Sequence, residues 1–278
     1  MGIQWYPGHM AKAKRELKEI LPLLDLVIEV TDARLPLSSR NPDLPILLGE
    51  KARILVINKV DLADPEVTAG WVKYYRALGE KVVDFNARLG EHLSRLESLV
   101  SKEEEKILPK KAALRLGVIG APNCGKSSVL NRLVGRSAAR VGEKPGITRG
   151  RQWVKRGKWE ILDTPGLLWP KISNQETGQK LALIGMIRPE VLDVEELVFY
   201  LIGWLRENYL AELMAYYSLE REEAPFKMLV EIGERRGCLG KGGQVNLLRA
   251  AELVWNDFRA GRLGRITLEK PSTFPVSR

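Results

Sequence analysis

Cysteine and histidine are scarce in this sequence of 278 residues, which has two of each. The two cysteines, Cys124 and Cys238, cannot form a disulfide framework, and no spacing of cysteine and histidine fits a structural zinc site. These absences exclude small disulfide-stabilised folds and zinc modules. We therefore expect the protein to work in a reducing cytoplasm.

Long hydrophobic stretches are also missing. The longest apolar run without a charge, 197–205, is far too short to cross a bilayer, and the first residues lack the apolar core of a signal peptide. We expect no stable membrane association. The remaining composition, 45% hydrophobic and 28% charged, is that of a globular chain with one large domain or two unequal ones.

Acidic residues are outnumbered by basic ones, 35 to 44, which gives a net charge of +9. This excess favours a polyanionic partner, although a solvated surface has the same composition. Residues 1–24 are predicted to include a helix with one apolar face, which would dock on the protein, and one basic face, which would meet phosphates. A helix lying on a membrane surface is the alternative interpretation.

The segment 120–127 reads Gly-Ala-Pro-Asn-Cys-Gly-Lys-Ser, which fits the phosphate-loop pattern, and the apolar run 116–119 before it is typical of a buried strand. In this pattern the backbone N–H groups face a polyphosphate, Lys126 adds a positive charge and the Ser127 hydroxyl holds Mg²⁺. The residues expected to contact phosphate are Asn123, Cys124, Gly125, Lys126, Ser127 and Ser128. The pattern predicts that a nucleoside triphosphate binds with Mg²⁺.

Strands and helices alternate along the first two thirds of the chain. The predicted strands are 26–30, 54–57, 82–85, 116–119, 152–155 and 159–162, with a short helix at 93–100 and a charged connector at 101–111. This order predicts a doubly wound α/β fold with a mostly parallel, six-stranded sheet, whose ligands lie at the carboxyl ends of the strands. From about residue 174 the pattern is helical only, with helices at 194–208, 226–236 and 245–259 and a capping box at Asp193 and Glu196. We expect three parts: the N-terminal basic helix at 1–24, a nucleotide-binding domain at 25–173 and an all-helical domain at 174–278.

The tetrapeptide Asn58-Lys59-Val60-Asp61 follows the second strand and indicates which base is bound. A carboxylate at Asp61 can accept hydrogen bonds from N1–H and the 2-amino group of guanine, neither of which adenine offers. An adenine would leave that carboxylate unpaired at a cost of about 1–3 kcal/mol per hydrogen bond. The pattern therefore favours GTP over ATP.

Two further segments complete a GTPase set. Asp163-Thr164-Pro165-Gly166 stands where an acidic residue at a strand end would hold the Mg²⁺ shell, with the Gly166 N–H available to the γ-phosphate. Thr148 lies in the loop before the fifth strand and is expected to be a second hydroxyl on Mg²⁺. The predicted metal ligands are therefore Ser127, Thr148 and Asp163.

The order of these motifs is unusual, because the guanine motif precedes the phosphate loop. The start Trp-Tyr-Pro-Gly-His-Met and the segment Asp32-Ala33-Arg34 are two further features of the sequence. On these two features and on the motif order, the sequence resembles the circularly permuted GTPases of the ribosome biogenesis GTPase A (YlqF) family over essentially its whole length. The resemblance implies a cytoplasmic GTPase, which we expect to be a monomer, that acts on a precursor of the large (50S) ribosomal subunit and binds rRNA. It also implies that Asn86 and Ala87 contact the base, although the family's wider class often has Ser-Ala-Lys where this chain has Asn86-Ala87-Arg88. Asn123 resembles the asparagine with which potassium-stimulated GTPases hold K⁺.

A catalytic glutamine is missing after Asp-x-x-Gly, where Leu167 and Leu168 stand instead. We expect slow intrinsic hydrolysis and a catalytic group from elsewhere. His9, in the family's N-terminal motif, is the candidate. A contact of His9 with rRNA, or a helix cap, is equally compatible with the sequence.

Basic residues concentrate at the C-terminal end: 227–278 carries 10 basic and 5 acidic residues, against 4 and 10 in 175–226. A glycine-rich loop at 237–243 joins two predicted helices here, and we expect it to bind RNA phosphates. The residues of this expected patch are Arg235, Arg236, Lys241 and Arg249. A solvated helix connector is the alternative. For the whole chain, the rival functions are a GTP-dependent RNA-binding scaffold with incidental hydrolysis and a membrane-associated GTPase switch.

Overall fold

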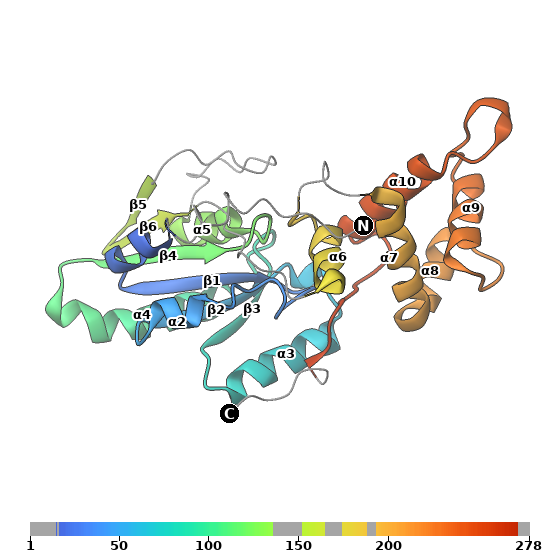
Figure 1. Cartoon of the computed structure of the whole chain (residues 1–278). Helices are drawn as coiled ribbons and strands as arrows, with labels where there is room; N and C mark the ends of the chain where they lie inside the picture. The colour runs from blue at the N-terminus through green and yellow to red at the C-terminus, as the bar shows by residue number, and fades with distance from the viewer. Residues whose placement is uncertain (1–14, 16, 136–151, 165–173, 188–192, 272–278) are drawn as a thin grey trace. The chain divides into compact units, whose positions relative to one another are not determined.

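The computed structural model of the chain describes residues 15, 17–135, 152–164, 174–187 and 193–271 (Figure 1). These residues form two compact units. One contains the sheet and includes the described residues between 15 and 164 and those at 267–271, and the other is helical and includes the described residues between 174 and 266.

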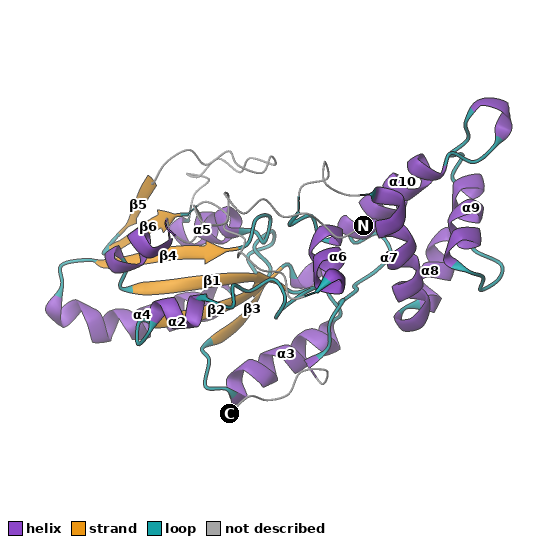
Figure 2. Ribbon diagram, in the orientation of Figure 1, coloured by secondary structure: helices purple, strands orange, loops and turns teal. Residues whose placement is uncertain are grey.

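A six-stranded sheet is the centre of the first unit, in the order β3-β2-β1-β4-β6-β5 (Figure 2). The strands are β1 (Leu26–Asp32), β2 (Ala52–Asn58), β3 (Val82–Phe85), β4 (Leu114–Gly120), β5 (Gln152–Arg156) and β6 (Trp159–Asp163). All neighbouring strands run parallel except β5, which is antiparallel to β6. The predicted α/β fold class is confirmed.

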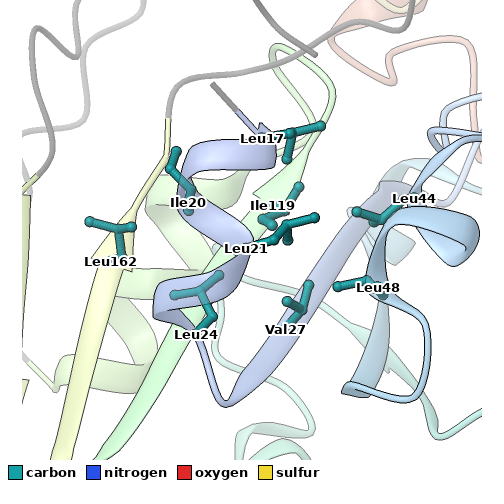
Figure 3. Packing of buried hydrophobic residues seen from close by; sticks show 9 residues of the cluster. All are labelled: Leu17, Ile20, Leu21, Leu24, Val27, Leu44, Leu48, Ile119 and Leu162. Atoms are coloured by element: carbon teal, nitrogen blue, oxygen red, sulfur yellow. The ribbon is translucent and has the colours of Figure 1, made fainter. Parts of the chain in front are cut away.

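One face of the sheet is covered by the N-terminal segment and by helices α2 (Leu44–Leu48) and α3 (Pro65–Ala77). Four of the apolar residues expected on the buried face of the N-terminal helix pack here, as Figure 3 shows, while Met10 and Ala13 of that face lie outside the described residues. They are Leu17, Ile20, Leu21 and Leu24, which join Val27, Ile119 and Leu162 of the strands. Because these side chains are almost completely buried, their packing anchors the start of the described chain to the sheet.

The other face is buried as well, because the strand residues that point to it, such as Ile28 and Ile54, are fully inaccessible. The helices α4 (Leu93–Ile107) and α5 (Lys126–Val134) contact the strands of the sheet. The sequence predicted that α4 ends at residue 100, followed by a charged connector, and this was wrong. The helix continues through 101–107 because Glu103 is buried and bonds Lys81 and Lys106, so a charged stretch remains helical.

The second unit is all helical in its described residues. Its helices are α6 (Gln175–Leu183), α7 (Val194–Asn208), α8 (Leu210–Tyr217), α9 (Pro225–Arg235) and α10 (Leu247–Arg259). The Asp193 carboxylate accepts a hydrogen bond from the Glu196 N–H at 3.0 Å, so the predicted cap of α7 is formed. Leu201, Ile202 and Leu205 of α7 are fully buried, and α7 contacts α6, α8, α9 and α10. No helix among the described residues is long and apolar enough to span a membrane.

The segment 267–271 belongs to the sheet unit, although the sequence predicted that the helical domain extends to the last residue. The Leu268 N–H donates to the carbonyl of Arg34 at 2.8 Å, and the Trp71 indole donates to the carbonyl of Glu269 at 3.0 Å. These bonds join residues that are about two hundred positions apart. A helical pattern that stops near residue 259 carries no signal for such a return of the chain.

Candidate functional site

The loops that carry the predicted motifs lie at one edge of the sheet. Asp32 pairs in register with Asn58, Asn58 pairs with Phe85, and Val118 pairs with Asp163. Since these strands are parallel, the segments that follow their carboxyl ends meet at the same edge. The strand register therefore brings together the phosphate loop, the guanine motif, Asn86 and Asp163.

Two glycines of the phosphate loop are required by their surroundings. A Cβ atom at Gly120 would lie 2.3 Å from the carbonyl oxygen of Val30. Gly125 has a φ of +94°, and a Cβ atom there would lie 2.2 Å from the Asn58 amide nitrogen. The pattern G-x-x-x-x-G is thus fixed here by close backbone approach and by a left-handed turn.

The side chains of the phosphate loop differ in their burial. Lys126 is 7% exposed and donates from Nζ to the carbonyl of Ala121 at 2.8 Å, so it curls over its own loop. Cys124 is fully buried, and burial raises the pKa of its thiol, which removes it as a reactive thiolate. Asn123 is exposed and has a left-handed φ of 59°.

Asp163 and Ser127 fit a magnesium site. Burial raises the pKa of Asp163, against the opposing charge of Lys126 and a hydrogen bond from Ser127. The Asp163 Oδ1 atom is buried and has no hydrogen-bond partner among the described residues. A carboxylate oxygen without a partner beside a hydroxyl is the hard, oxygen-rich ligand set that Mg²⁺ prefers.

Asn58 joins the guanine motif to the phosphate loop. Its side-chain amide donates to the carbonyl of Cys124 at 2.9 Å, and its Oδ1 accepts from the Ala87 N–H at 3.1 Å. The side chain is 1% exposed, so both bonds are shielded from water. One residue therefore holds three loops of the site together. The Ala87 N–H, expected from the sequence to contact the base, is engaged by this bond.

Lys59 is held by a buried carboxylate that the sequence did not identify as part of the site. Its Nζ lies 2.9 Å from Asp32 Oδ2 and donates to the carbonyl of Asn123. Arg34 donates to the same carboxylate from Nε at 2.9 Å and from Nη2 at 2.8 Å. Burial alone would raise the pKa of Asp32, but the charges and hydrogen bonds of Arg34 and Lys59 outweigh it and hold the pKa well below its ordinary value.

Asp61, the predicted base-recognising carboxylate, is partly exposed in a short 3₁₀ turn (Val60–Leu62). Its Oδ2 lies 3.5 Å from Nε of Arg88, whose side chain is largely exposed. Asn86 is 1% exposed and accepts from the N–H groups of Arg88 and Leu89. The structure thus brings the predicted base contacts Asn58, Lys59, Asp61, Asn86 and Ala87 to one place.

Three predicted site residues lie outside the described residues. These are His9, Thr148 and Gly166. Their roles stay predictions. The described ligands of the predicted metal site are Ser127 and Asp163, and Ser128 lies in the first turn of α5.

The predicted RNA-binding residues all lie on the surface of the helical unit, but two of them are engaged within it. Arg235 bonds the carboxylates of Glu220 and Glu231, each at 2.8 Å, and Arg236 stacks on Tyr216 and donates to its carbonyl at 2.9 Å. The other two are Lys241 and Arg249. Lys241 lies at the tip of a hairpin-like loop, 237–246, and Arg249 lies in the first turn of α10.

The 237–246 loop is closed by its own backbone. Leu239 and Val245 form a β-bridge, the Gly240 N–H donates to the carbonyl of Gln244 at 2.8 Å, and the Asn246 side chain accepts from the Arg249 N–H. The sequence predicted that backbone N–H groups of this segment would face phosphates. Because several of them are used internally, the feature that the loop offers to an anion is the exposed cation at its tip.

Comparisons with known proteins place these observations in a family. Residues 115–230 match the family described as 50S ribosome-binding GTPase. The matched region begins in β4 and includes the phosphate loop, Asp163 and the first helices of the helical unit.

Several relatives align over almost the full chain. The sequence is 40% identical to ribosome biogenesis GTPase A of Bacillus cereus over 99% of this chain and 96% of that protein. It is 32% identical to ribosome biogenesis GTPase A of Thermotoga maritima, over 97% of this chain and 95% of that protein. It is also 33% identical to mitochondrial ribosome-associated GTPase 1 of Bos taurus, over 96% of this chain and 88% of that protein.

Solved structures agree with this relationship. The structure titled as GNP-bound YlqF from T. maritima has a TM-score of 0.67 and 28% sequence identity, and covers 94% of this chain and 98% of that one. The structure titled as GDP-bound TM YlqF also has a TM-score of 0.67, with 27% identity, 93% of this chain and all of that one. The fold, the motifs and the full-length similarity lead to one conclusion: the chain is a GTPase and belongs to the ribosome biogenesis GTPase A family.

Proposed function

We propose that this GTPase binds a precursor of the large ribosomal subunit and hydrolyses GTP when bound to it. The observation that supports this best is the Asn58 side chain, which links the phosphate loop at Cys124 to the base loop at Ala87. Because this link holds the two loops next to each other, one ligand that carries both a guanine base and a polyphosphate can contact both of them. The family model and the names of the relatives supply the ribosomal context.

The residues of the site suggest how GTP is held. Asp61 accepts hydrogen bonds from the guanine edge, and Lys126 turns from the Ala121 carbonyl to the β- and γ-phosphates. Ser127, Asp163 and Thr148 would hold a Mg²⁺ ion, and that ion would supply positive charge beside the phosphates. The buried Asp163 Oδ1, which has no hydrogen-bond partner among the described residues, is the atom that this ion would satisfy.

Hydrolysis needs a group that orients the attacking water. With Leu167 in place of the glutamine of Ras-like enzymes, this chain has no such group next to Gly166. His9, or a group supplied by the particle, takes this role in our proposal. A water-orienting residue acts mainly in the transition state, so it alters turnover more than nucleotide affinity.

The direct test is multiple-turnover hydrolysis with and without large-subunit precursor particles. We expect the particles to increase the rate strongly and to co-sediment with the protein more in the presence of a non-hydrolysable GTP analogue than of GDP. A rate that particles leave unchanged, with co-sedimentation intact, would favour the scaffold function instead. Mature large subunits serve as the control in both measurements.

The 237–246 loop is the proposed RNA contact, because Lys241 at the tip of this self-bonded segment is an exposed cation and Arg249, in the first turn of α10 that follows, is another. Each phosphate contact contributes about 0.7–0.9 to the slope of log affinity against log salt. Replacing both residues by glutamine should therefore flatten the slope of particle binding by roughly 1.4–1.8.

A matched control removes the same charge elsewhere in the helical unit. Lys227 and Arg221 are exposed and lie near the start of α9, whereas the loop follows its end. Replacing these two by glutamine should leave the salt slope near wild type. Equal slopes for both double variants would remove the loop as the RNA site. GTP binding should be unchanged in either variant.

A further inference from the structure

The 86–91 loop, expected to contact the base, is closed on itself. Asn86 Oδ1 accepts from the N–H groups of Arg88 and Leu89 at 3.1 and 3.2 Å, and the Gly90 N–H donates to the Asn86 carbonyl at 2.7 Å. The Asn86 amide also bonds the Glu91 carboxylate at 2.9 Å. These bonds use the N–H groups of the turn and leave the carbonyls of Ala87 and Arg88 directed outward from it.

Both of these carbonyls are bound by one side chain from the phosphate-loop helix. Arg132 of α5 donates from Nε to the Ala87 carbonyl at 2.8 Å and from Nη2 to the Arg88 carbonyl. The planar guanidinium makes both bonds in a fixed geometry, which a flexible lysine does not reproduce. Two consecutive peptide groups are therefore oriented by a residue outside the loop.

Gly90 makes room for this contact. A Cβ atom at Gly90 would lie 3.4 Å from Nη1 and 3.5 Å from Cζ of Arg132, and its φ is +83°. The loop backbone thus passes close to the guanidinium in a conformation that favours glycine. The contact between α5 and the loop is part of the local fold.

Ala87 is consequently held at both of its polar backbone groups. Asn58 accepts from its N–H, and Arg132 donates to its carbonyl. Asn58 also bonds Cys124 in the phosphate loop, and Arg132 lies two turns along the helix that this loop begins. The position of Ala87 relative to the phosphates is therefore set from two sides.

From this arrangement we infer that Arg132 is a positioning residue for guanine recognition. It fixes the Ala87 backbone at the distance from the phosphate loop at which the Ala87 N–H meets the 6-oxo group of the base, sharing its proton with Asn58. The inference rests on the base contacts assigned under the proposed function, and it adds a residue outside every guanine motif. Its effect is specific to the 6-oxo edge, since the 2-amino edge belongs to Asp61.

Two analogues of GDP separate the two edges of the base. 6-Thio-GDP keeps N1–H and the 2-amino group but has a weak acceptor at position 6, whereas IDP keeps the 6-oxo group and lacks the 2-amino group. We expect the wild-type protein to bind GDP more tightly than either analogue. The ratio to 6-thio-GDP reports on the 86–91 loop, and the ratio to IDP reports on Asp61.

In Arg132→Ala, GDP affinity should fall roughly 5- to 10-fold, as expected for one net hydrogen bond at the base. The preference for GDP over 6-thio-GDP should decrease by the same factor, while the preference for GDP over IDP stays at its wild-type value. Arg132→Lys, which can make one of the two bonds, should lie between. Titration calorimetry or competition with a fluorescent GDP measures all three affinities.

Arg156→Ala is the matched control. Arg156 donates to the Leu133 carbonyl in α5 and pairs with Glu97 at 2.5 Å, but it belongs to β5. The Arg156→Ala variant should leave the preferences for GDP over 6-thio-GDP and for GDP over IDP unchanged. If Arg132→Ala weakens the binding of GDP and of 6-thio-GDP equally, so that the preference between them stays at its wild-type value, the positioning role is wrong. If wild type itself does not distinguish GDP from 6-thio-GDP, the base contact of the 86–91 loop fails, and the inference fails with it.

Discussion

Asp32 offers a sharp test of how the site is supported. Its carboxylate is fully buried and accepts two hydrogen bonds from the guanidinium of Arg34, at 2.9 and 2.8 Å, while Lys59 lies 2.9 Å away. In Asp32→Asn the guanidinium of Arg34, whose side chain is 3% exposed, loses the negative charge of this carboxylate. Removing one partner of a buried pair costs about 3–5 kcal/mol, because an uncompensated charge remains inside. We expect this loss in the free energy of unfolding of the sheet.

The loss should depend on pH in a defined direction. Because Arg34 and Lys59 outweigh the effect of burial, the folded pKa of Asp32 lies below the ordinary value of 3.8. A carboxylate with a lowered folded pKa stabilises the fold above its unfolded pKa, and this contribution is lost as the pH falls below that value towards the folded pKa. The difference between wild type and Asp32→Asn should therefore be largest at neutral pH and smaller near pH 3.

Urea unfolding followed by hydrogen exchange and mass spectrometry measures this difference, because peptides from β1 and β2 are read separately from the helical unit. Glu160→Gln is the control. Glu160 pairs with Lys155 and Arg115, whose side chains are 75% and 52% exposed, so its removal should have a much smaller effect. A loss below about 1 kcal/mol in Asp32→Asn, or a difference that does not change with pH, would refute the reasoning.

Four further outcomes test the nucleotide site. Asp61→Asn should shift preference from GTP towards XTP, since an amide can donate to the 2-oxo group of xanthine; an unchanged GTP preference in competition binding would contradict the guanine assignment. Lys126→Ala should weaken GTP binding with or without EDTA, whereas Ser127→Ala should do so mainly in Mg²⁺ buffer, and equal effects in EDTA would argue against metal contact by Ser127. Replacing Na⁺ by K⁺ should raise the hydrolysis rate if Asn123 helps to hold a monovalent cation, and identical rates in both salts would remove that role. His9→Ala should lower particle-stimulated turnover at near wild-type GTP affinity, whereas a fall in particle binding would make His9 an RNA contact.

The sequence by itself determined the positions of the strands along the chain, the fold class and the place of the phosphate and guanine motifs. Each of these signals is carried by contiguous residues. Gly125 occupies a left-handed turn and is recognised from the phosphate-loop pattern, and β4 is recognised from an unbroken apolar run. Neither prediction needs knowledge of distant contacts. The cap at Asp193 could be predicted for the same reason, because its partner lies three residues away.

The tertiary structure alone decided which side chains support the site. Asp32 reaches Lys59 because β1 and β2 pair in register, and Arg132 reaches Ala87 because its side chain extends from α5 to the loop that follows β3. Arg235, counted in the sequence as a free cation, is neutralised by carboxylates from two different segments. Glu231 lies one helical turn before Arg235 and could be read from the sequence, but the other partners lie 15 to 45 residues away in the chain, and no local pattern encodes them. Only the packing of the strands and helices brings such groups within hydrogen-bond distance, so residues that position others are visible only in the folded molecule.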